Sequence, residues 1–292
     1  MTALLTAEGI SVRYGGVRAL DGVSIAVEPG EILGLIGANG AGKTTLFECI
    51  AGFNRPVAGT ITFDGHDITA ATPEHRARLG LIRSFQDARL FESLTVFQTL
   101  LVAQEKRRPS ALLADVAGLP GTRRTERAKA AAADELLATM GLTAYRDRLV
   151  AELSTGTRRI TELACVLALE PRLLLLDEPS SGIAQREVEA LGALLRRIKE
   201  TTGCTMLVIE HDMPLVMGMA DRIVALESGR FLAEGTPAEI QVHPGVIASY
   251  LGSTAETIHR SGTAPSSAAT SPAPVPARRP PARPRRTAPR GA

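Results

Sequence analysis

Nine residues in the N-terminal part of the chain constrain its fold more than any other segment. Gly37-Ala-Asn-Gly-Ala-Gly-Lys-Thr-Thr45 fits the pattern G-x-x-x-x-G-K-[ST]. The apolar run at residues 32–36 is typical of a buried strand, and residues 44–51 are expected to form a helix. A strand, a glycine-rich turn and a helix in this order predict a loop whose backbone N–H groups surround phosphate oxygens. A chance glycine-rich turn is the alternative.

The residue types of this loop fit a nucleoside triphosphate and its metal ion. Lys43 supplies a positive charge to the β- and γ-phosphates, and the hydroxyl of Thr44 can ligate Mg²⁺. The residues predicted to bind the nucleotide here are Gly37, Asn39, Gly40, Gly42, Lys43, Thr44 and Thr45.

The distribution of charge argues against a nucleic-acid partner. The 292 residues have a formal charge of +2, but residues 262–292 contain six Arg and no Lys, Asp or Glu. Residues 1–261 therefore carry a formal charge of −4, whereas a body held on nucleic acid by one basic face would be positive.

The cysteines and the apolar runs favour a chain that works in the cytosol. Cys49, Cys165 and Cys204 form no C-x-x-C pair and have no His at metal-ligand spacing, which favours buried thiols in a reducing compartment. No run approaches 18 apolar residues, and the first residues do not resemble a signal peptide.

The pattern of apolar residues predicts an α/β fold. Helical periodicity marks residues 126–140, with Gly141 as the C-terminal cap, and the segments around 160–167 and 188–198. Strands that alternate with helices imply a parallel sheet covered by helices. The strands expected after the glycine loop are at 60–63, 173–176, 206–209 and 223–226, and those before it are at 10–14 and 23–27.

The last part of the chain differs in composition. Residues 262–292 hold eight of the 18 prolines and no aromatic residue, and we predict a disordered tail over 253–292. Its arginines could contact anionic lipid headgroups, or the tail could be a passive, solvated extension.

Two carboxylates follow the apolar strand at 173–176. Asp177 is suited to hold the metal ion, usually through water, because a hard cation prefers oxygen ligands. Glu178 can act as a general base or orient water for attack on the γ-phosphorus. A strand ending in a solvated Asp-Glu turn is the alternative, which the upstream phosphate loop disfavours.

Three further side chains are expected at the nucleotide. His211 follows the strand at 206–209 and could donate to the γ-phosphate or to the attacking water. Gln86 lies where the strand-rich region passes into a helical one, and its amide could reach Mg²⁺ or the water. Tyr14 precedes a Gly-Gly turn and could stack on adenine. The alternatives are a structural or exposed His, an exposed loop Gln and a cross-strand aromatic pair.

A second anion site is predicted far from the glycine loop in sequence. In Leu153-Ser-Thr-Gly-Thr-Arg-Arg159, which precedes an amphipathic helix, Ser154 is a good N-terminal capping residue. The amides around Gly156 at the helix N-terminus favour an anion. One chain therefore carries two half-sites for phosphate.

The order of these motifs resembles the nucleotide-binding subunit of an ATP-binding cassette (ABC) transporter, over about residues 4–252. Tyr14 resembles the adenine-stacking residue of that family, Gln86 its Q-loop and His211 its switch histidine. The glycine loop resembles its Walker A motif, residues 153–159 its signature and residues 173–178 its Walker B motif.

The resemblance implies a P-loop NTPase (RecA-like) core with an N-terminal antiparallel β subdomain and an inserted helical subdomain at about 89–159. It implies ATP and Mg²⁺ as ligands. It also implies two subunits paired head-to-tail, in which Ser154 and Gly156 of one bind the γ-phosphate held by Lys43 of the other. ATP would close the pair and hydrolysis would reopen it.

A narrower resemblance, to the branched-chain amino acid (Liv-type) uptake ATPases, rests on three segments. They are the long stretch between Gln86 and Ser154, the tract at 209–218, and the ending at 233–252. It implies transmembrane permease subunits and a second ABC subunit, identical or not, as partners, with a solute-binding protein as an indirect one. The subunit would lie peripherally on the cytoplasmic face of the membrane.

The chain departs from the family pattern at three positions. The signature commonly has Gly at the position of Thr155 and Gln at that of Thr157, and an Asp or Asn is expected near Ala184. These changes bear on the composite site rather than on ATP binding itself. The rival functions are the ATPase of an ABC exporter and a soluble, non-transport ABC ATPase.

Overall fold

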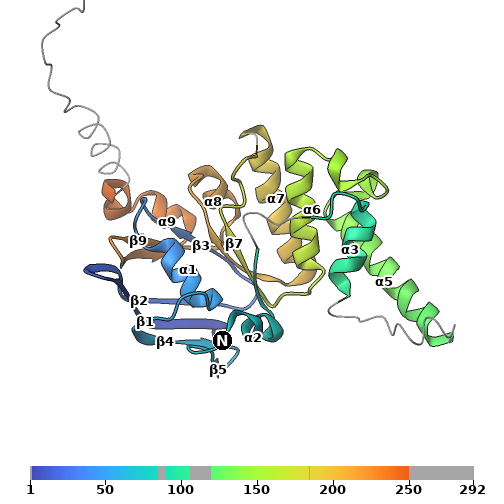
Figure 1. Cartoon of the computed structure of the whole chain (residues 1–292). Helices are drawn as coiled ribbons and strands as arrows, with labels where there is room; N and C mark the ends of the chain where they lie inside the picture. Colours follow the sequence, from blue (N-terminus) through green and yellow to red (C-terminus); the bar gives the residue numbers. More distant parts are fainter. Residues whose placement is uncertain (1, 85–89, 106–119, 184, 250–292) are drawn as a thin grey trace, which may run out of the picture. The chain divides into compact units, whose positions relative to one another are not determined.

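Two β-sheets and the helix between them position the predicted nucleotide loop (Figure 1). They are seen in a computed structural model that describes residues 2–84, 90–105, 120–183 and 185–249, with only the backbone of 120–124 and 185–187. The disordered tail predicted for 253–292 lies outside these residues.

The N-terminal sheet is antiparallel, in the order β2-β1-β4-β5. Its first two strands, β1 (Leu5–Tyr14) and β2 (Val17–Val27), are joined at Gly15, whose φ of 58° suits glycine, and Tyr14 pairs with Val17. The other two are β4 (Ala58–Phe63) and β5 (His66–Asp67). Both of the strands predicted here before the loop, at 10–14 and 23–27, are present and extend further toward the N-terminus.

The second sheet is mixed and has the order β10-β9-β3-β8-β7-β6. Neighbouring strands are parallel except β10, which runs antiparallel to β9. The strands are β3 (Ile32–Ile36), β6 (Leu81–Arg83), β7 (Leu173–Asp177), β8 (Thr205–Ile209), β9 (Arg222–Glu227) and β10 (Arg230–Gly235).

Both faces of this second sheet are buried. On β3, Leu33 and Leu35 pack with α1 (Lys43–Ala51) and the N-terminal sheet, whereas Ile32 and Ile36 pack with the later helices. The alternation follows from the two-residue period of a strand and explains why the central strands are continuously apolar. The structure confirms the predicted P-loop NTPase core with an N-terminal antiparallel sheet.

Helices α3 (Val96–Gln104), α5 (Pro120–Thr139) and α6 (Thr155–Leu167) gather at one side of the sheet, on the right of Figure 1. Two short 3₁₀ turns, Thr143–Tyr145 and Val150–Glu152, lead from α5 to α6. The remaining helices are α2 (Pro73–Leu79), α7 (Gln185–Thr202), α8 (Met213–Met219) and α9 (Pro237–Gln241).

Helix α5 and strand β10 differ from the sequence-based expectation. Helix α5 begins at Pro120 rather than at 126, because proline at the start of a helix needs no N–H and already has a helical φ. It ends as predicted near Gly141, whose φ is 69°. Strand β10 was not predicted; three of its six residues are exposed, and its apolar residues do not alternate with polar ones.

Arg76 fixes the C-terminal end of α1. Its side chain is 1% exposed and donates hydrogen bonds to five backbone carbonyl oxygens, two of them at the end of α1 and three in the segment after β5. Burial lowers the pKa of Arg76 to about 10. Because it donates to carbonyls of both segments, Arg76 joins the helix behind the loop to the N-terminal sheet.

The three cysteines are free thiols, as expected. Cys49 and Cys204 are buried and Cys165 is partly buried; burial raises the pKa of Cys49 to about 11 and those of Cys165 and Cys204 to about 12. In the part of the chain that the structure describes, no helix is long and apolar enough to cross a membrane.

Candidate functional site

The glycine loop joins β3 to α1 and leaves no room for side chains at two of its positions. A Cβ at Gly37 would lie 2.4 Å from the carbonyl oxygen of Leu226, and one at Gly42 would lie 2.7 Å from that of Ala19. Gly37, Gly40 and Gly42 have φ values of 151°, 82° and 96°. The loop therefore needs glycine both for its backbone conformation and for its contacts with β2 and β9.

Lys43 lies inside this loop rather than in solvent. It is 5% exposed, and its Nζ donates to the carbonyl oxygens of Gly37 at 2.7 Å and Ala38 at 3.1 Å. Burial lowers its pKa, while the carboxylates of Glu178 and Asp177 act to raise it. The ammonium group of Lys43 thus stabilises the loop conformation and lies near the two carboxylates at the C-terminal end of β7.

The donors of the loop fit a nucleotide phosphate with a metal ion. Asn39, Gly40 and Thr44 are exposed at the loop and Thr45 is half-buried at the start of α1. The N-terminus of α1 has Gly42 as its cap, no side-chain cap and no acidic residue in its first turn, so its amides favour an anion. The absence of side chains at Gly37 and Gly42 lets the loop pack against backbone atoms of β9 and β2.

Asp177 ends β7 and is paired with an arginine that the sequence analysis did not single out. The Nη2 of Arg83, at the end of β6, lies 2.7 Å from Oδ2 of Asp177, and the two side chains are 20% and 7% exposed. The guanidinium also lies 5.6 Å from the ring centroids of Phe47 and Phe53. Arg83 therefore orients the carboxylate of Asp177 while its guanidinium packs near Phe47 of α1.

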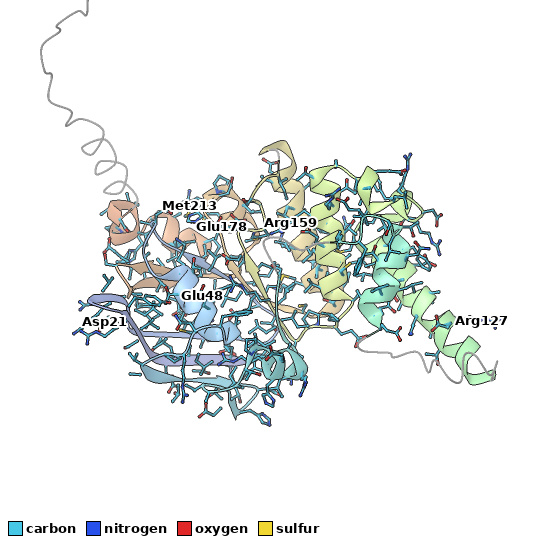
Figure 2. All side chains as sticks on the ribbon, in the orientation of Figure 1. Asp21, Glu48, Arg127, Arg159, Glu178 and Met213 are labelled. Atoms are coloured by element: carbon cyan, nitrogen blue, oxygen red, sulfur yellow. The ribbon has the colours of Figure 1, made fainter. Side chains whose placement is uncertain are left out.

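Glu178 and His211 are brought together at the ends of neighbouring strands. The Nε2 of His211 lies 2.8 Å from Oε1 of Glu178, and Glu178 N–H donates to the carbonyl oxygen of Ile209 at 2.9 Å. Glu178 has a φ of 47°, in the left-handed region that a non-glycine residue seldom adopts. Figure 2 shows its side chain at the end of β7.

Glu210 is the other residue that sequence reasoning missed. It is 1% exposed and accepts hydrogen bonds from Ser180 and from the backbone of His211. The signal was present, because Glu210, like Asp177, is an acidic residue placed directly after a wholly apolar strand. Arg83 could be found in the same way, as a charged residue at the end of a short apolar segment.

Tyr14 lies at the tip of the β1–β2 hairpin and is 52% exposed. Its hydroxyl accepts a hydrogen bond from the side-chain amide of Asn54, just after α1. The ring is thus tied by its polar end to the chain that follows the glycine-loop helix, with an exposed surface that suits stacking.

The second predicted anion site lies on a helix that covers the opposite face of the central sheet from α1. Ser154 caps α6: its Oγ accepts the N–H of Thr157 at 3.2 Å and lies 2.9 Å from the Oγ1 of Thr157. Ser154 and Gly156 line a cavity of about 180 Å³ with residues of α7. The predicted cap is confirmed, and within one chain the two predicted half-sites belong to different layers.

The departures at 155 and 157 are accommodated locally. Thr155 is the first residue of α6 and belongs to the helix, whose backbone conformation threonine can adopt. The hydroxyl of Thr157 takes a place beside Ser154, so a polar group remains at the position of the usual glutamine. The predictions for Gln86 and Ala184 fall on residues that the structure does not describe.

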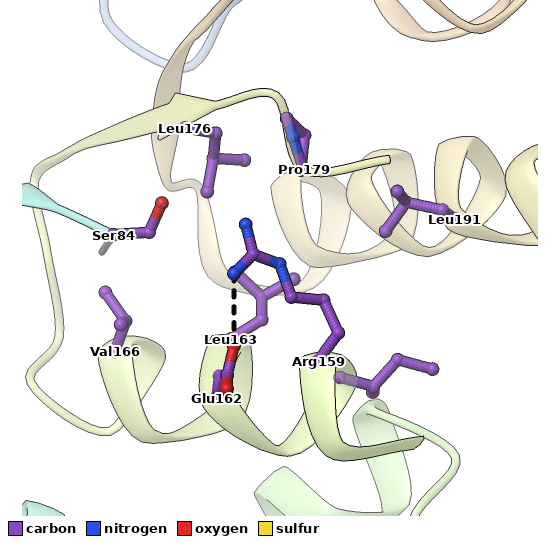
Figure 3. A pocket seen from close by; sticks show the side chains of 9 residues that line it. Ser84, Arg159, Glu162, Leu163, Val166, Leu176, Pro179 and Leu191 are labelled. Carbon is purple, nitrogen blue, oxygen red and sulfur yellow. Dashed lines mark hydrogen bonds and ion pairs between the residues drawn. The ribbon is translucent and has the colours of Figure 1, made fainter. Parts of the chain in front are cut away.

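A small apolar pocket separates α6 from the end of β7 (Figure 3). Its volume is about 30 Å³, and Ser84, Leu163, Val166, Leu176 and Pro179 contribute to its lining. Arg159 and Glu162 of α6 form an ion pair of 3.1 Å at this pocket. The middle of α6, from Arg159 to Val166, thus lies across this pocket from the end of β7.

The arrangement within one chain provides a phosphate cradle, an ammonium group, two carboxylates and an imidazole at the carboxyl end of a parallel sheet. This edge is where open α/β sheets bind ligands. Groups of these types can contact a triphosphate and a water molecule beside it.

Two family models and two relatives that match this chain all describe ATP-binding transport proteins. The model of the ABC transporter family matches residues 20–181, and that of a branched-chain amino acid ATP-binding cassette transporter matches residues 232–256. The high-affinity branched-chain amino acid transport ATP-binding protein BraF of Pseudomonas aeruginosa is 40% identical over 249 residues, which cover 85% of this chain and 98% of that protein. The corresponding protein LivG of Escherichia coli is 39% identical over the same length and with the same coverage.

Solved structures are similar over most of the chain. The ADP conformation of MJ1267, an ATP-binding cassette of an ABC transporter, superposes with a TM-score of 0.72 at 28% identity, covering 86% of this chain and all of that one. The cbiO1 protein of Clostridium perfringens, part of the ABC transporter complex cbiONQ, gives 0.71 at 26% identity, covering 90% of this chain and 100% of that one.

Proposed function

The chain belongs to the ABC transporter family, and from this premise we propose that it is the ATP-hydrolysing subunit of an importer of branched-chain amino acids or related amino acids and amides. The observation that supports ATP hydrolysis is the meeting of Lys43, Asp177, Glu178 and His211 at one edge of the central sheet.

Each of these groups has a distinct task in hydrolysis. Lys43 binds the β- and γ-phosphates, Glu178 accepts the proton of the attacking water, and His211 orients Glu178 and the γ-phosphate. Thr44 and Asp177 would hold Mg²⁺, with Gln86 as a further ligand. The ion, when bound, neutralises charge on the phosphates.

The site is completed by a second ATP-binding subunit, either a copy of this chain or a sister chain. Ser154 and Gly156 of one subunit would contact the γ-phosphate bound at Lys43 of the other. ATP then favours the closed pair, because ADP lacks the phosphate that the helix tip contacts. A ligand shifts such an equilibrium only by its differential affinity for the two states.

The energy of closure reaches the substrate through other subunits. Transmembrane permease subunits would dock on the surface near Gln86 and the helices at 89–159, which places the chain on the cytoplasmic face of the membrane. A solute-binding protein would deliver the substrate. The amino-acid assignment rests on the relatives and on the match at residues 232–256.

Reconstitution tests the proposal directly. The chain, its permease partners and the binding protein are placed in lipid vesicles with ATP on the side of the ATP-binding subunits. We expect ATP-dependent uptake of labelled leucine, isoleucine or valine, and none with Glu178→Gln. Export of substrate, or ATP hydrolysis without transport of any amino acid or amide, would overturn it.

A further inference from the structure

Glu210 is a buried carboxylate to which the mechanism above gives no task. It follows the last residue of β8 directly and is 1% exposed. Carboxylates are seldom this buried unless something holds them.

The contacts of Glu210 join two loops that are 30 residues apart. Its Oε1 accepts the backbone N–H of Ser180 at 2.7 Å. Its Oε2 accepts the Ser180 hydroxyl at 2.9 Å and the backbone N–H of His211 at 3.1 Å. Both oxygens are therefore used, and both loops are held by the same side chain.

These loops carry the two groups that act on water. Ser180 lies two residues after Glu178, and the N–H of Ser181 donates to the carbonyl oxygen of Glu178 at 3.0 Å. His211 contacts Glu178 through its ring at 2.8 Å. The path from Glu178 through Ser180, Glu210 and His211 therefore closes on itself, and Glu210 is its one buried charged member.

The backbone conformation of Glu178 has to be stabilised by contacts such as these. Its φ of 47° is unfavourable for a residue with a Cβ, so the surrounding contacts must hold it. Two hydrogen bonds from Ser180 to Glu210 hold the turn that follows.

We propose that Glu210 is a positioning residue for ATP hydrolysis, which sets the placement of the Glu178 carboxylate against the His211 imidazole by holding both of their loops. This inference rests on the proposed function, because it assigns Glu178 and His211 to the water molecule.

Glu210→Gln is the sharpest test, because it keeps the size of the side chain. Whichever way the amide is turned, its NH₂ group faces a backbone N–H, of Ser180 or of His211, which then loses its acceptor. Loss of this hydrogen bond should displace the loop that carries Glu178 or His211, and a misplaced group lowers the rate of a positioned reaction by about 10- to 100-fold. Glu227→Gln, at the exposed end of β9, is the matched control.

The measurements are kcat and KM for ATP in the transporter complex, together with the melting temperature of the subunit. We expect Glu210→Gln to lower kcat while KM changes by less than about twofold, and Glu227→Gln to change neither. Adding His211→Ala to Glu210→Gln should cost less than the product of the two single losses, because both act on one arrangement.

An unchanged kcat in Glu210→Gln, a loss of kcat matched by an equal rise in KM, or losses that multiply would overturn the inference. If Glu210→Gln does not fold, Ser180→Ala removes one of the three hydrogen bonds and decides the question: a lower kcat at unchanged KM supports it, and an unchanged kcat refutes it. Failure of the proposed function has a different signature, namely a complex whose hydrolysis is insensitive to Glu178→Gln.

Discussion

The two half-sites predicted for phosphate, at Lys43 and at Ser154, are built in contrasting ways. The half at Lys43 is assembled from residues far apart in sequence, since Gly42 is in contact with β2, Gly37 with β9, and Asp177 with Arg83. The half at Ser154 is a single helix tip, whose hydrogen bonds span three residues.

This difference explains where the sequence is free to vary. A Cβ at Gly37 or Gly42 would collide with backbone atoms of another strand, so those positions are fixed by the fold. At the helix tip, Thr155 and Thr157 depart from the family pattern and still give a capped helix. The half at Lys43 is held by tertiary contacts, whereas the half at Ser154 is held by hydrogen bonds within one helix tip.

The largest effect is expected at the first half, from Glu178→Gln. Removal of a general base lowers the rate by about 10²- to 10⁴-fold, whereas the charge at Lys43 that binds ATP remains. Steady-state hydrolysis and ATP binding measure the two effects separately, and the variant should accumulate as a closed, ATP-bound pair. Hydrolysis at the wild-type rate would remove Glu178 from this role.

The second half is tested by Ser154→Asp. Aspartate caps a helix as well as serine does, so the melting temperature should hold, but its charge repels the γ-phosphate. We expect ATP-driven pairing to be lost and hydrolysis to fall by about 100-fold, on the scale of losing a transition-state contact. Thr72→Asp makes the same kind of change at the cap of α2 and should leave hydrolysis intact.

Arg83→Met tests the tertiary ties of the first half through stability. It leaves a largely buried Asp177 without its cation, and we expect the free energy of unfolding to fall by about 3 kcal/mol. Arg18→Met should cost less than about 0.5 kcal/mol, because Arg18 is 55% exposed and Asp21 retains Arg230. Equal losses in urea unfolding would show that the Arg83 contact is unimportant.

The smallest effect is expected from Thr157→Val. The change removes the hydroxyl beside Ser154 and keeps the backbone N–H that Ser154 caps. A net hydrogen bond of about 1 kcal/mol corresponds to a decrease in kcat of about fivefold. Thr161→Val, one turn further along α6, is the control, since its hydroxyl bonds only to the helix backbone. Indistinguishable rates in the two variants would contradict a role for Thr157.

The sequence predicted most of the residues that meet near Lys43, because they lie in short, contiguous motifs. The glycine loop, Asp177, Glu178 and His211 each follow an apolar strand, and parallel strands end at one edge. Arg83 and Glu210 could be noticed as charged residues after apolar segments, but their contacts could not be predicted, because their partners lie 94 and 30 residues away and only the packed sheet brings them together. Strand β10 was not predicted for another reason, because its apolar and polar residues do not alternate.

The central claim is that ATP held at Lys43 of one subunit is completed by Ser154 of its neighbour. The most direct test is the specific ATPase activity of the purified subunit, alone or with a sister subunit, as a function of protein concentration, with sedimentation recording the state of association. The claim predicts that activity per subunit falls toward zero as the pairs dissociate, and that Ser154→Asp stays about 100-fold less active at every concentration. Undiminished activity at concentrations where the protein sediments as a monomer would contradict it.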